Sequence, residues 1–186
     1  MKAEQVLRRV LESLESVGIP YVVVGSFATN VYGIARATKD ADIVVQIGPR
    51  RLAELIKSLG PELECDPQIQ FESVTGTRKV LFYDRETAFT VELFWHSDDP
   101  HDQERFARRQ TFSIFGRDVW ILSREDVLVT KLRWLLLQNR PKDRIDIESV
   151  IAVQGDAIDW PYVEAWCDRH GSRTLLEQIR EELRRR

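Results

Sequence analysis

Apolar residues recur at three- and four-residue intervals at the start of the chain, which predicts a helix over residues 3–18 that buries one face and ends at Gly18. The short run 'YVVV' that follows has the composition of a buried strand. 'SFATNVYG' predicts a short helix beginning at Ser26, and 'DADIVVQI' predicts a second strand. The next helix begins at Pro49 and ends at Gly60, the usual asymmetry of helix ends.

The hydrophobic pattern changes period after this helix. 'RKVLFYD' and 'AFTVELFW' are rich in β-branched and aromatic residues and predict a hairpin that turns at residues 85–87. 'TFSIFGRDVWIL' predicts a further strand pair turning at Gly116 and Arg117. From Ser123 onward the pattern is helical, and Ser123 with Asp126 resembles a capping box. Four helices are expected there, and the segment 60–77 is the least defined by its pattern.

These elements predict an α/β (α+β) fold in two parts. Residues 1–122 are expected to form a mixed sheet flanked by helices, and residues 123–186 a C-terminal helical region that forms a bundle. A chain of 186 residues is long enough to bury a substantial core.

Composition excludes several function classes. With 43% hydrophobic and 31% charged residues and a formal charge of −3, the chain has no global positive field to hold nucleic acid, so any RNA contact must rest on local patches. Cys65 and Cys167 are far apart and form neither a disulfide framework nor a zinc site. The sequence shows no signal peptide and no apolar run of membrane-spanning length, so we expect a cytoplasmic protein without membrane contact.

Two carboxylates interrupt the second strand. Residues two apart on a strand point to the same face, so Asp40 and Asp42 project together. Such a pair either shares a proton or shares a cation, and oxygen ligands without His or Cys favour Mg²⁺. If the strand 'AFTVELFW' is a neighbour, Glu92 completes a three-carboxylate site for one or two metal ions.

The anion side of this chemistry lies upstream. Gly25 permits a tight turn from strand to helix, and Ser26 adds a hydroxyl beside free backbone N–H groups at the helix start, which is a natural phosphate seat. Arg36 and Lys39 are close enough in sequence to reach the same phosphates.

With these residues in place, the chain resembles the nucleotidyltransferases of the DNA polymerase β superfamily. 'GS' at 25–26, thirteen intervening residues and 'DADI' at 40–43 resemble the superfamily motif, and 'ARATKDADI' resembles its form in the AbiEii-like toxin branch and related minimal nucleotidyltransferases. Downstream, Asp126 and Lys131 resemble the Asp-x₄-Lys of that branch, as 'RPKDRIDI' resembles its basic-acidic segment. The Gly-Ser pair in place of Gly-Gly, Glu92 in place of the more usual Asp and the short chain are departures from the pattern.

The resemblance implies a nucleotidyltransferase (EC 2.7.7 type), with residues 1–122 as its catalytic domain, that moves an NMP from an NTP such as ATP to a hydroxyl acceptor. Two Mg²⁺ ions, or Mn²⁺ instead, would be held by Asp40, Asp42 and Glu92, which are also the catalytic residues. The expected nucleotide-binding residues are Gly25, Ser26, Arg36, Thr38 and Lys131. The acceptor would be tRNA, a protein or a small hydroxyl compound, and a toxin would have a cognate antitoxin as its partner.

Four of these candidate site residues also have a purely structural interpretation. Glu92 could be an outward-facing acid on an edge strand, and Ser26 a simple N-cap. Lys131 could extend from a helix interface, and Arg36 could pair with an aspartate. The alternative function is a catalytically inactive nucleotide-binding or protein-interaction module on the same fold.

Overall fold

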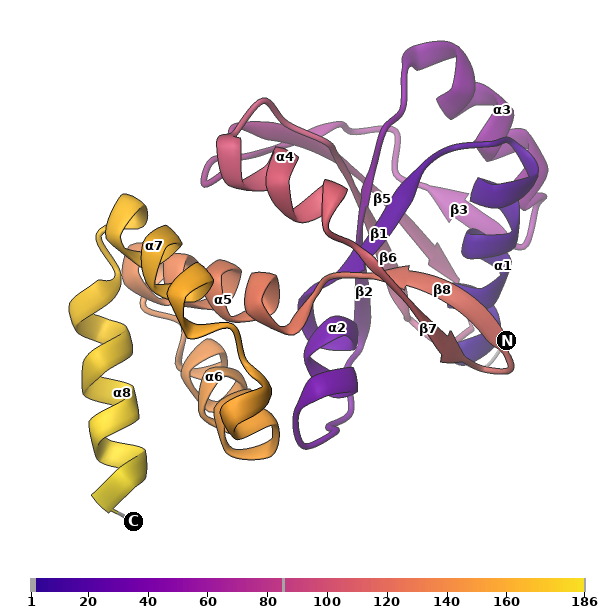
Figure 1. The fold of residues 1–186 in the computed structure, drawn as a ribbon. Helices are drawn as coiled ribbons and strands as arrows, with labels where there is room; N and C mark the ends of the chain where they lie inside the picture. Colours follow the sequence, from indigo (N-terminus) through magenta and orange to yellow (C-terminus); the bar gives the residue numbers. More distant parts are fainter. Residues whose placement is uncertain (1–2, 85, 186) are drawn as a thin grey trace. The chain divides into compact units, whose positions relative to one another are not determined.

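The structure is a computed structural model that describes residues 3–84 and 86–185 (Figure 1). It divides into two compact units. The sheet unit contains the chain up to Phe27 and residues 37–122, whereas the helical unit contains residues 28–36 and 123–186. One break follows Leu122, and residues 28–36 group with the C-terminal helices.

A single mixed sheet forms the centre of the sheet unit. Its strands run in the order β3-β5-β6-β2-β1-β8-β7, and β4 also pairs with β5. β1 pairs antiparallel with β2 and parallel with β8, and β2 pairs parallel with β6. The strands are β1 (Tyr21–Val24), β2 (Asp40–Val45), β3 (Leu63–Cys65), β4 (Gln70–Glu72), β5 (Thr77–Asp84), β6 (Thr90–Trp95), β7 (Gln110–Ile114) and β8 (Arg117–Ile121).

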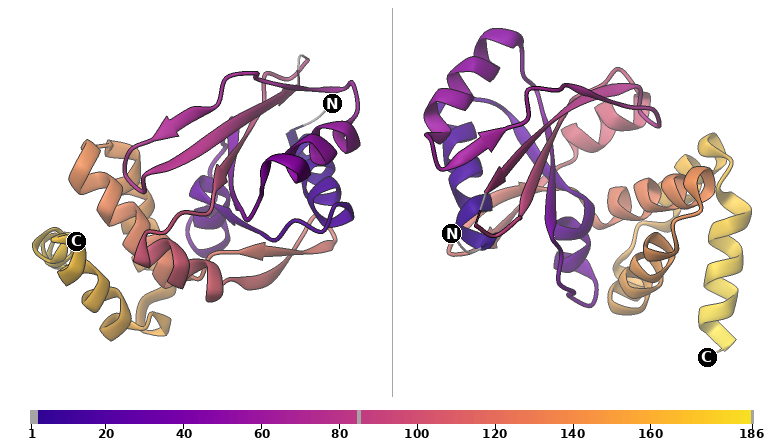
Figure 2. Two further views of the ribbon diagram at one scale, coloured as in Figure 1. Left: turned by 90° about the horizontal axis from the view of Figure 1, so that it is seen from above. Right: turned by 180° about the vertical axis from the view of Figure 1, so that it is seen from behind.

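The helices of this unit bury their apolar faces in its core. α1 (Ala3–Ser16) contacts β6 and lies beside α3 (Pro49–Leu59), as the views of Figure 2 show. The predicted apolar stripe of α1 is buried, and α3 begins at Pro49 and ends before Gly60 as expected. Strand side chains such as Ile43 and Leu93 are fully buried, and each stabilises the fold by about 1.5–3 kcal/mol.

The sheet unit differs from the sequence prediction in three places. Residues 60–77 contain the short strands β3 and β4, and α4 (Pro100–Ala107) forms where no helix was expected. Arg117 lies in β8, so the turn before it is made by Phe115 and Gly116, both with positive φ. Of the predicted hairpin turn 85–87, Arg85 lies outside the described residues, whereas Thr87 is held by the Asp84 carboxylate.

The helical unit consists of α5 (Arg124–Gln138), α6 (Pro141–Gln154), a 3₁₀ turn at Gly155–Ala157, α7 (Trp160–His170) and α8 (Arg173–Arg185). Ser123 is the N-cap of α5, because its hydroxyl accepts from the Asp126 amide, and it also donates to the Asp126 carboxylate at 2.6 Å. α5 ends at Asn139 in the left-handed conformation, and α7 ends at Gly171 in the same way. The mixed sheet, its flanking helices and the C-terminal bundle confirm the predicted fold class.

Residues 28–36 are fastened to α6. Gln154 Nε2 donates to the Tyr32 carbonyl at 2.8 Å, and the Ile34 amide donates to the Ser149 hydroxyl. Gly33 leaves no room for a side chain, because a Cβ there would lie 2.6 Å from Ser149 Oγ. α2 (Gly25–Tyr32) therefore begins in the sheet unit and continues into the helical unit.

Candidate functional site

The turn from β1 into α2 brings the backbone against a carboxylate. Gly25 has φ +61°, and a Cβ there would lie 2.0 Å from Asp42 Oδ2. The contact follows from the sheet register, in which Val24 is opposite Asp42. Only glycine combines this conformation with this approach. Ser26, in the first turn of α2, is buried beside it. The Gly-Ser pair and the acidic strand thus meet in the structure.

The three predicted acids lie on one face of two neighbouring strands. In the parallel pair β2–β6, Asp42 is directly opposite Glu92, and Asp40 is opposite Thr90. All three acids are half-buried, whereas Ala41 on the other face is buried. Opposite residues on adjacent strands lie about 5 Å apart at Cβ, so this face concentrates negative charge. The strand that carries Glu92 is therefore the neighbour of the strand that carries Asp40 and Asp42, as a three-carboxylate site requires.

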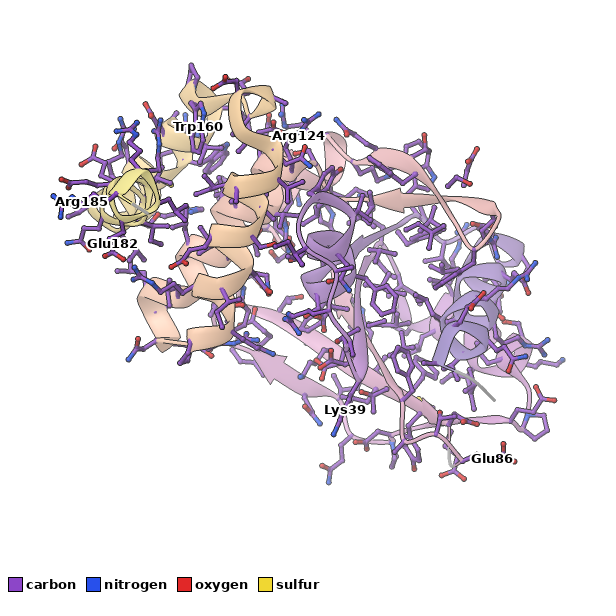
Figure 3. All side chains as sticks on the ribbon, turned by 90° about the horizontal axis from the view of Figure 1, so that it is seen from below. Lys39, Glu86, Arg124, Trp160, Glu182 and Arg185 are labelled. Carbon is purple, nitrogen blue, oxygen red and sulfur yellow. The ribbon has the colours of Figure 1, made fainter. Side chains whose placement is uncertain are left out.

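Asp40 and Glu92 each contact a polar side chain. Thr38 Oγ1 donates to Asp40 Oδ1 at 2.7 Å, which makes Thr38 a direct partner of the acidic pair. Lys79 Nζ on β5 lies 2.7 Å from Glu92 Oε2. Sequence reasoning did not single out Lys79, although a lysine within the apolar pattern of 'RKVLFYD' was a visible signal. Lys39, next to Asp40 in the chain, is exposed and extends away from the ribbon (Figure 3).

The acidic face has the donor chemistry that a hard divalent cation requires, namely carboxylate oxygens without His or Cys. Asp40 and Asp42 share a face, and Glu92 is adjacent. Within the described part of the chain, however, no three His, Cys, Asp or Glu side chains are grouped closely enough to hold one ion. Glu92 accepts a hydrogen bond from Lys79 Nζ instead. The donor types suit a divalent cation, and Glu92 is paired with Lys79 in this arrangement.

A second polar cluster lies in the helical unit. Lys131 on α5 is 7% exposed, and its Nζ donates to Asp143 Oδ1 at 2.9 Å and to Asp146 Oδ2 at 2.7 Å. Arg36 binds both carboxylate oxygens of Asp146, at 2.9 Å and 3.0 Å. Arg140 Nε approaches Asp143 Oδ2 at 3.3 Å, an ion-pair contact without hydrogen-bond geometry. The predicted nucleotide-binding residues Arg36 and Lys131 thus share one aspartate.

The electrostatics of this cluster depend on its ion pairs. Burial alone would raise the pKa of Asp146, but the hydrogen bonds and charges of Arg36 and Lys131 outweigh it and hold the pKa below its ordinary value. Asp126, the other acid of the downstream resemblance, is fully buried. It accepts from Ser123 and from the Tyr162 hydroxyl, at 2.6 Å and 2.7 Å. Asp126 therefore fixes the start of α5 and joins it to α7.

Comparison with known proteins shows which family has this arrangement of residues. A family described as nucleotidyl transferase AbiEii toxin of a type IV toxin–antitoxin (TA) system matches residues 7–186. The chain belongs to the AbiEii family. It is a nucleotidyltransferase by family, so the recognition and the enzyme class expected from the sequence are both confirmed. A search of curated proteins gives no match to this AbiEii-family chain.

Several solved structures share the fold of this AbiEii-family protein. A nucleotidyltransferase-like antigen from Paracoccidioides brasiliensis is 20% identical with a TM-score of 0.62, covering 96% of this chain and 91% of that one. The antibiotic-resistance factor ANT(2'')-Ia in solution is 16% identical with a TM-score of 0.59, covering 96% of both chains. The lincosamide adenylyltransferase LnuA is 13% identical with a TM-score of 0.51, covering 80% and 96%. At these identities the likeness supports the fold alone.

Two further findings bear on the class of protein. Among residues 3–84 and 86–185, none of the helices has the length and hydrophobicity of a membrane span. Both cysteines are free thiols, and burial raises the pKa of each. Neither thiol belongs to the acidic face or to the Lys131 cluster.

Proposed function

We propose that this AbiEii-family protein transfers an NMP from an NTP to a hydroxyl acceptor on the acidic face of β2 and β6. The close approach of Gly25 to Asp42 carries the proposal, because it places the first turn of α2 directly against a carboxylate. Helix starts attract phosphate oxygens, and paired carboxylates attract the cation that accompanies a triphosphate.

Asp40, Asp42 and Glu92 would hold Mg²⁺, with Mn²⁺ as a substitute. The metal, when bound, supplies positive charge that stabilises the phosphate oxygens and lowers the pKa of an attacking hydroxyl. Thr38 fixes the orientation of Asp40 through the hydrogen bond between their side chains. Gly25 and Ser26 would seat the β and γ phosphates, and Glu92 would help to remove the acceptor proton.

Arg36, Thr38 and Lys131 complete the proposed nucleotide-binding set. Arg36 and Lys131 would contact phosphate oxygens while Asp146 and Asp143 hold their charged groups in fixed positions. Cations that are already fixed in place stabilise the charge that develops during phosphoryl transfer, because no free energy is needed to reorient them during the reaction.

The acceptor we propose is tRNA or a protein, in keeping with the toxin description of the family. A cognate antitoxin would be the partner and the cytoplasm the location. A small hydroxyl compound is a third acceptor class, because structures with the same fold include ANT(2'')-Ia with adenylyl-2''-tobramycin and LnuA with lincomycin.

A second candidate function is a binding module without turnover. The pairing of Glu92 with Lys79 favours it, because a third acid that stays neutralised cannot join a metal site. The two candidates differ in whether pyrophosphate is released.

The test is pyrophosphate release with each of the four NTPs, Mg²⁺, total bacterial RNA and cell extract. We expect release with the native protein and a loss of about a thousandfold in Asp42→Asn and in the Asp40→Ala/Asp42→Ala double variant. Asp98→Asn, an exposed acid of the same unit, is the matched control and should retain full activity. Binding of NTP without release in the native protein would instead support the binding module.

A further inference from the structure

Lys79 meets the acidic face from the neighbouring strand. In the antiparallel pair β5–β6, Leu81 is opposite Glu92 and Lys79 is opposite Phe94, so Lys79 is the diagonal neighbour of Glu92 on the same face. Its ammonium lies 2.7 Å from Glu92 Oε2 and 5.5 Å from the centre of the Phe94 ring. Two contacts on β6 thus hold one cation beside the third acid.

This ion pair is better shielded from water than an ordinary surface pair. The side chains of Lys79 and Glu92 are each only 20% exposed. Surface pairs contribute about 0–1 kcal/mol because water screens the charges and flexible side chains lose freedom on pairing. Here the aromatic ring and the strand restrict the ammonium beforehand. The exposed Lys39, by contrast, has no such restriction.

A divalent cation and this ammonium need the same carboxylate. Glu92 is opposite Asp42, so a metal on the acidic face would draw on Glu92 oxygens. Two cations cannot both approach one carboxylate oxygen closely without strong repulsion. We infer that Lys79 is the resident counter-ion of Glu92 and competes with the divalent cation for it, so that Lys79 sets the metal affinity of the site. The inference rests on the proposed metal-dependent function.

The first experiment measures Mn²⁺ affinity directly, from the electron paramagnetic resonance signal of free Mn²⁺, in native protein, Lys79→Gln and Arg78→Gln. Arg78 is the matched control, because it removes the same charge from the adjacent position of β5 and its exposed side chain points to the opposite face. We expect Lys79→Gln to bind Mn²⁺ about fivefold more tightly than native protein and Arg78→Gln to stay within about twofold.

The second experiment uses the native chain and does not depend on a variant's folding. An amine-reactive acylating reagent is applied with and without saturating Mg²⁺, and modified lysines are quantified by mass spectrometry. We expect Mg²⁺ to accelerate the labelling of Lys79 several-fold, because the displaced ammonium loses its partner, and to leave Lys39 unchanged. The Asp40→Asn/Asp42→Asn variant should show no acceleration.

Three results would overturn the inference: an equal affinity in Lys79→Gln and Arg78→Gln, a weaker affinity in Lys79→Gln, or no Mn²⁺ binding in any variant. The pyrophosphate assay separates this failure from that of the proposed function. If the native protein transfers nucleotide but Lys79→Gln binds Mn²⁺ like the control, only the counter-ion role is wrong. If Lys79→Gln binds Mn²⁺ more tightly but the native protein releases no pyrophosphate, the counter-ion role is supported and the proposed transferase function is wrong.

Discussion

At the scale of single residues, Gly25 has the sharpest requirement in the molecule. Replacing it with Ala imposes a positive-φ penalty of about 1 kcal/mol and also drives a methyl group into the Asp42 carboxylate. We expect Gly25→Ala to lose about 1–3 kcal/mol of unfolding free energy and at least about a hundredfold in pyrophosphate release. Urea unfolding and the release assay measure the two effects.

Gly76 provides the control for this prediction. It has φ +68°, and a Cβ there would meet nothing within 4 Å, so Gly76→Ala isolates the backbone penalty. Gly76→Ala should lose about 1 kcal/mol and keep its activity. Equal activity in the two variants would show that the Asp42 carboxylate does not need its present position.

The sequence predicted the residues of the acidic face but not their partners. The alternation of 'DADI' placed Asp40 and Asp42 on one face, because strand periodicity is a local property. The pairing of Glu92 with Lys79 depends on the β5–β6 register and could not be read from spacing. The contact between Gly25 and Asp42 likewise arises only when β1 and β2 pair.

At the scale of elements, the Lys131 cluster joins α5 to α6. Removing the lysine leaves Asp143 and Asp146 as buried carboxylates with fewer partners. We therefore expect Lys131→Met to lose about 3 kcal/mol of unfolding free energy, measured by urea unfolding. Arg133→Met, a half-buried cation on the same helix, is the comparison and should lose less than about 1 kcal/mol. Similar losses in both variants would contradict a special role for the cluster.

The same cluster predicts a pH dependence. The pKa of Asp146 is lower in the folded than in the unfolded protein, so its ionisation stabilises the fold above the unfolded value of about 3.9. This stabilisation is lost as the pH falls from there through the folded pKa. The free energy of unfolding should thus drop less steeply below about pH 4 in Asp146→Asn than in native protein. Asp156→Asn, an exposed acid of the same unit, should follow the native curve, and a parallel curve for Asp146→Asn would refute the argument.

One element escaped prediction although its start was visible in the sequence. α4 begins with Asp99 as N-cap, which accepts from two backbone amides, and with Pro100 at the first position. Both are standard start signals. The segment lacks a clear apolar stripe, because its buried residues include His101, Asp102 and Arg105. Asp102 accepts from Ser97 and Arg105, so polar contacts replace the apolar face that sequence patterns detect.

At the scale of the whole molecule, cooperativity should follow the two units rather than the order of the chain. Lys131→Met should increase hydrogen exchange in residues 28–36 together with α6, because both belong to the helical unit, and should leave β5 and β6 protected. Exchange is measured by mass spectrometry of peptic fragments.

The reciprocal variant is Leu93→Ala, which removes a fully buried side chain of β6 and should cost about 2–5 kcal/mol. It should raise exchange in β2 and β6 and spare residues 28–36. Exchange in residues 28–36 that rises with Leu93→Ala and not with Lys131→Met would mean that this segment belongs to the sheet unit.

The membership of residues 28–36 has a consequence for recombining genes of this family. The chain passes between the units after residues 27, 36 and 122, so no single junction separates them. In a chimera that joins two relatives at residue 123, residues 32–34 would come from one parent. Their hydrogen-bond partners at positions 149 and 154 would come from the other. Functional chimeras should therefore inherit residues 28–36 and 123–186 from the same parent, even though the shorter of these segments lies inside the nucleotidyltransferase motif.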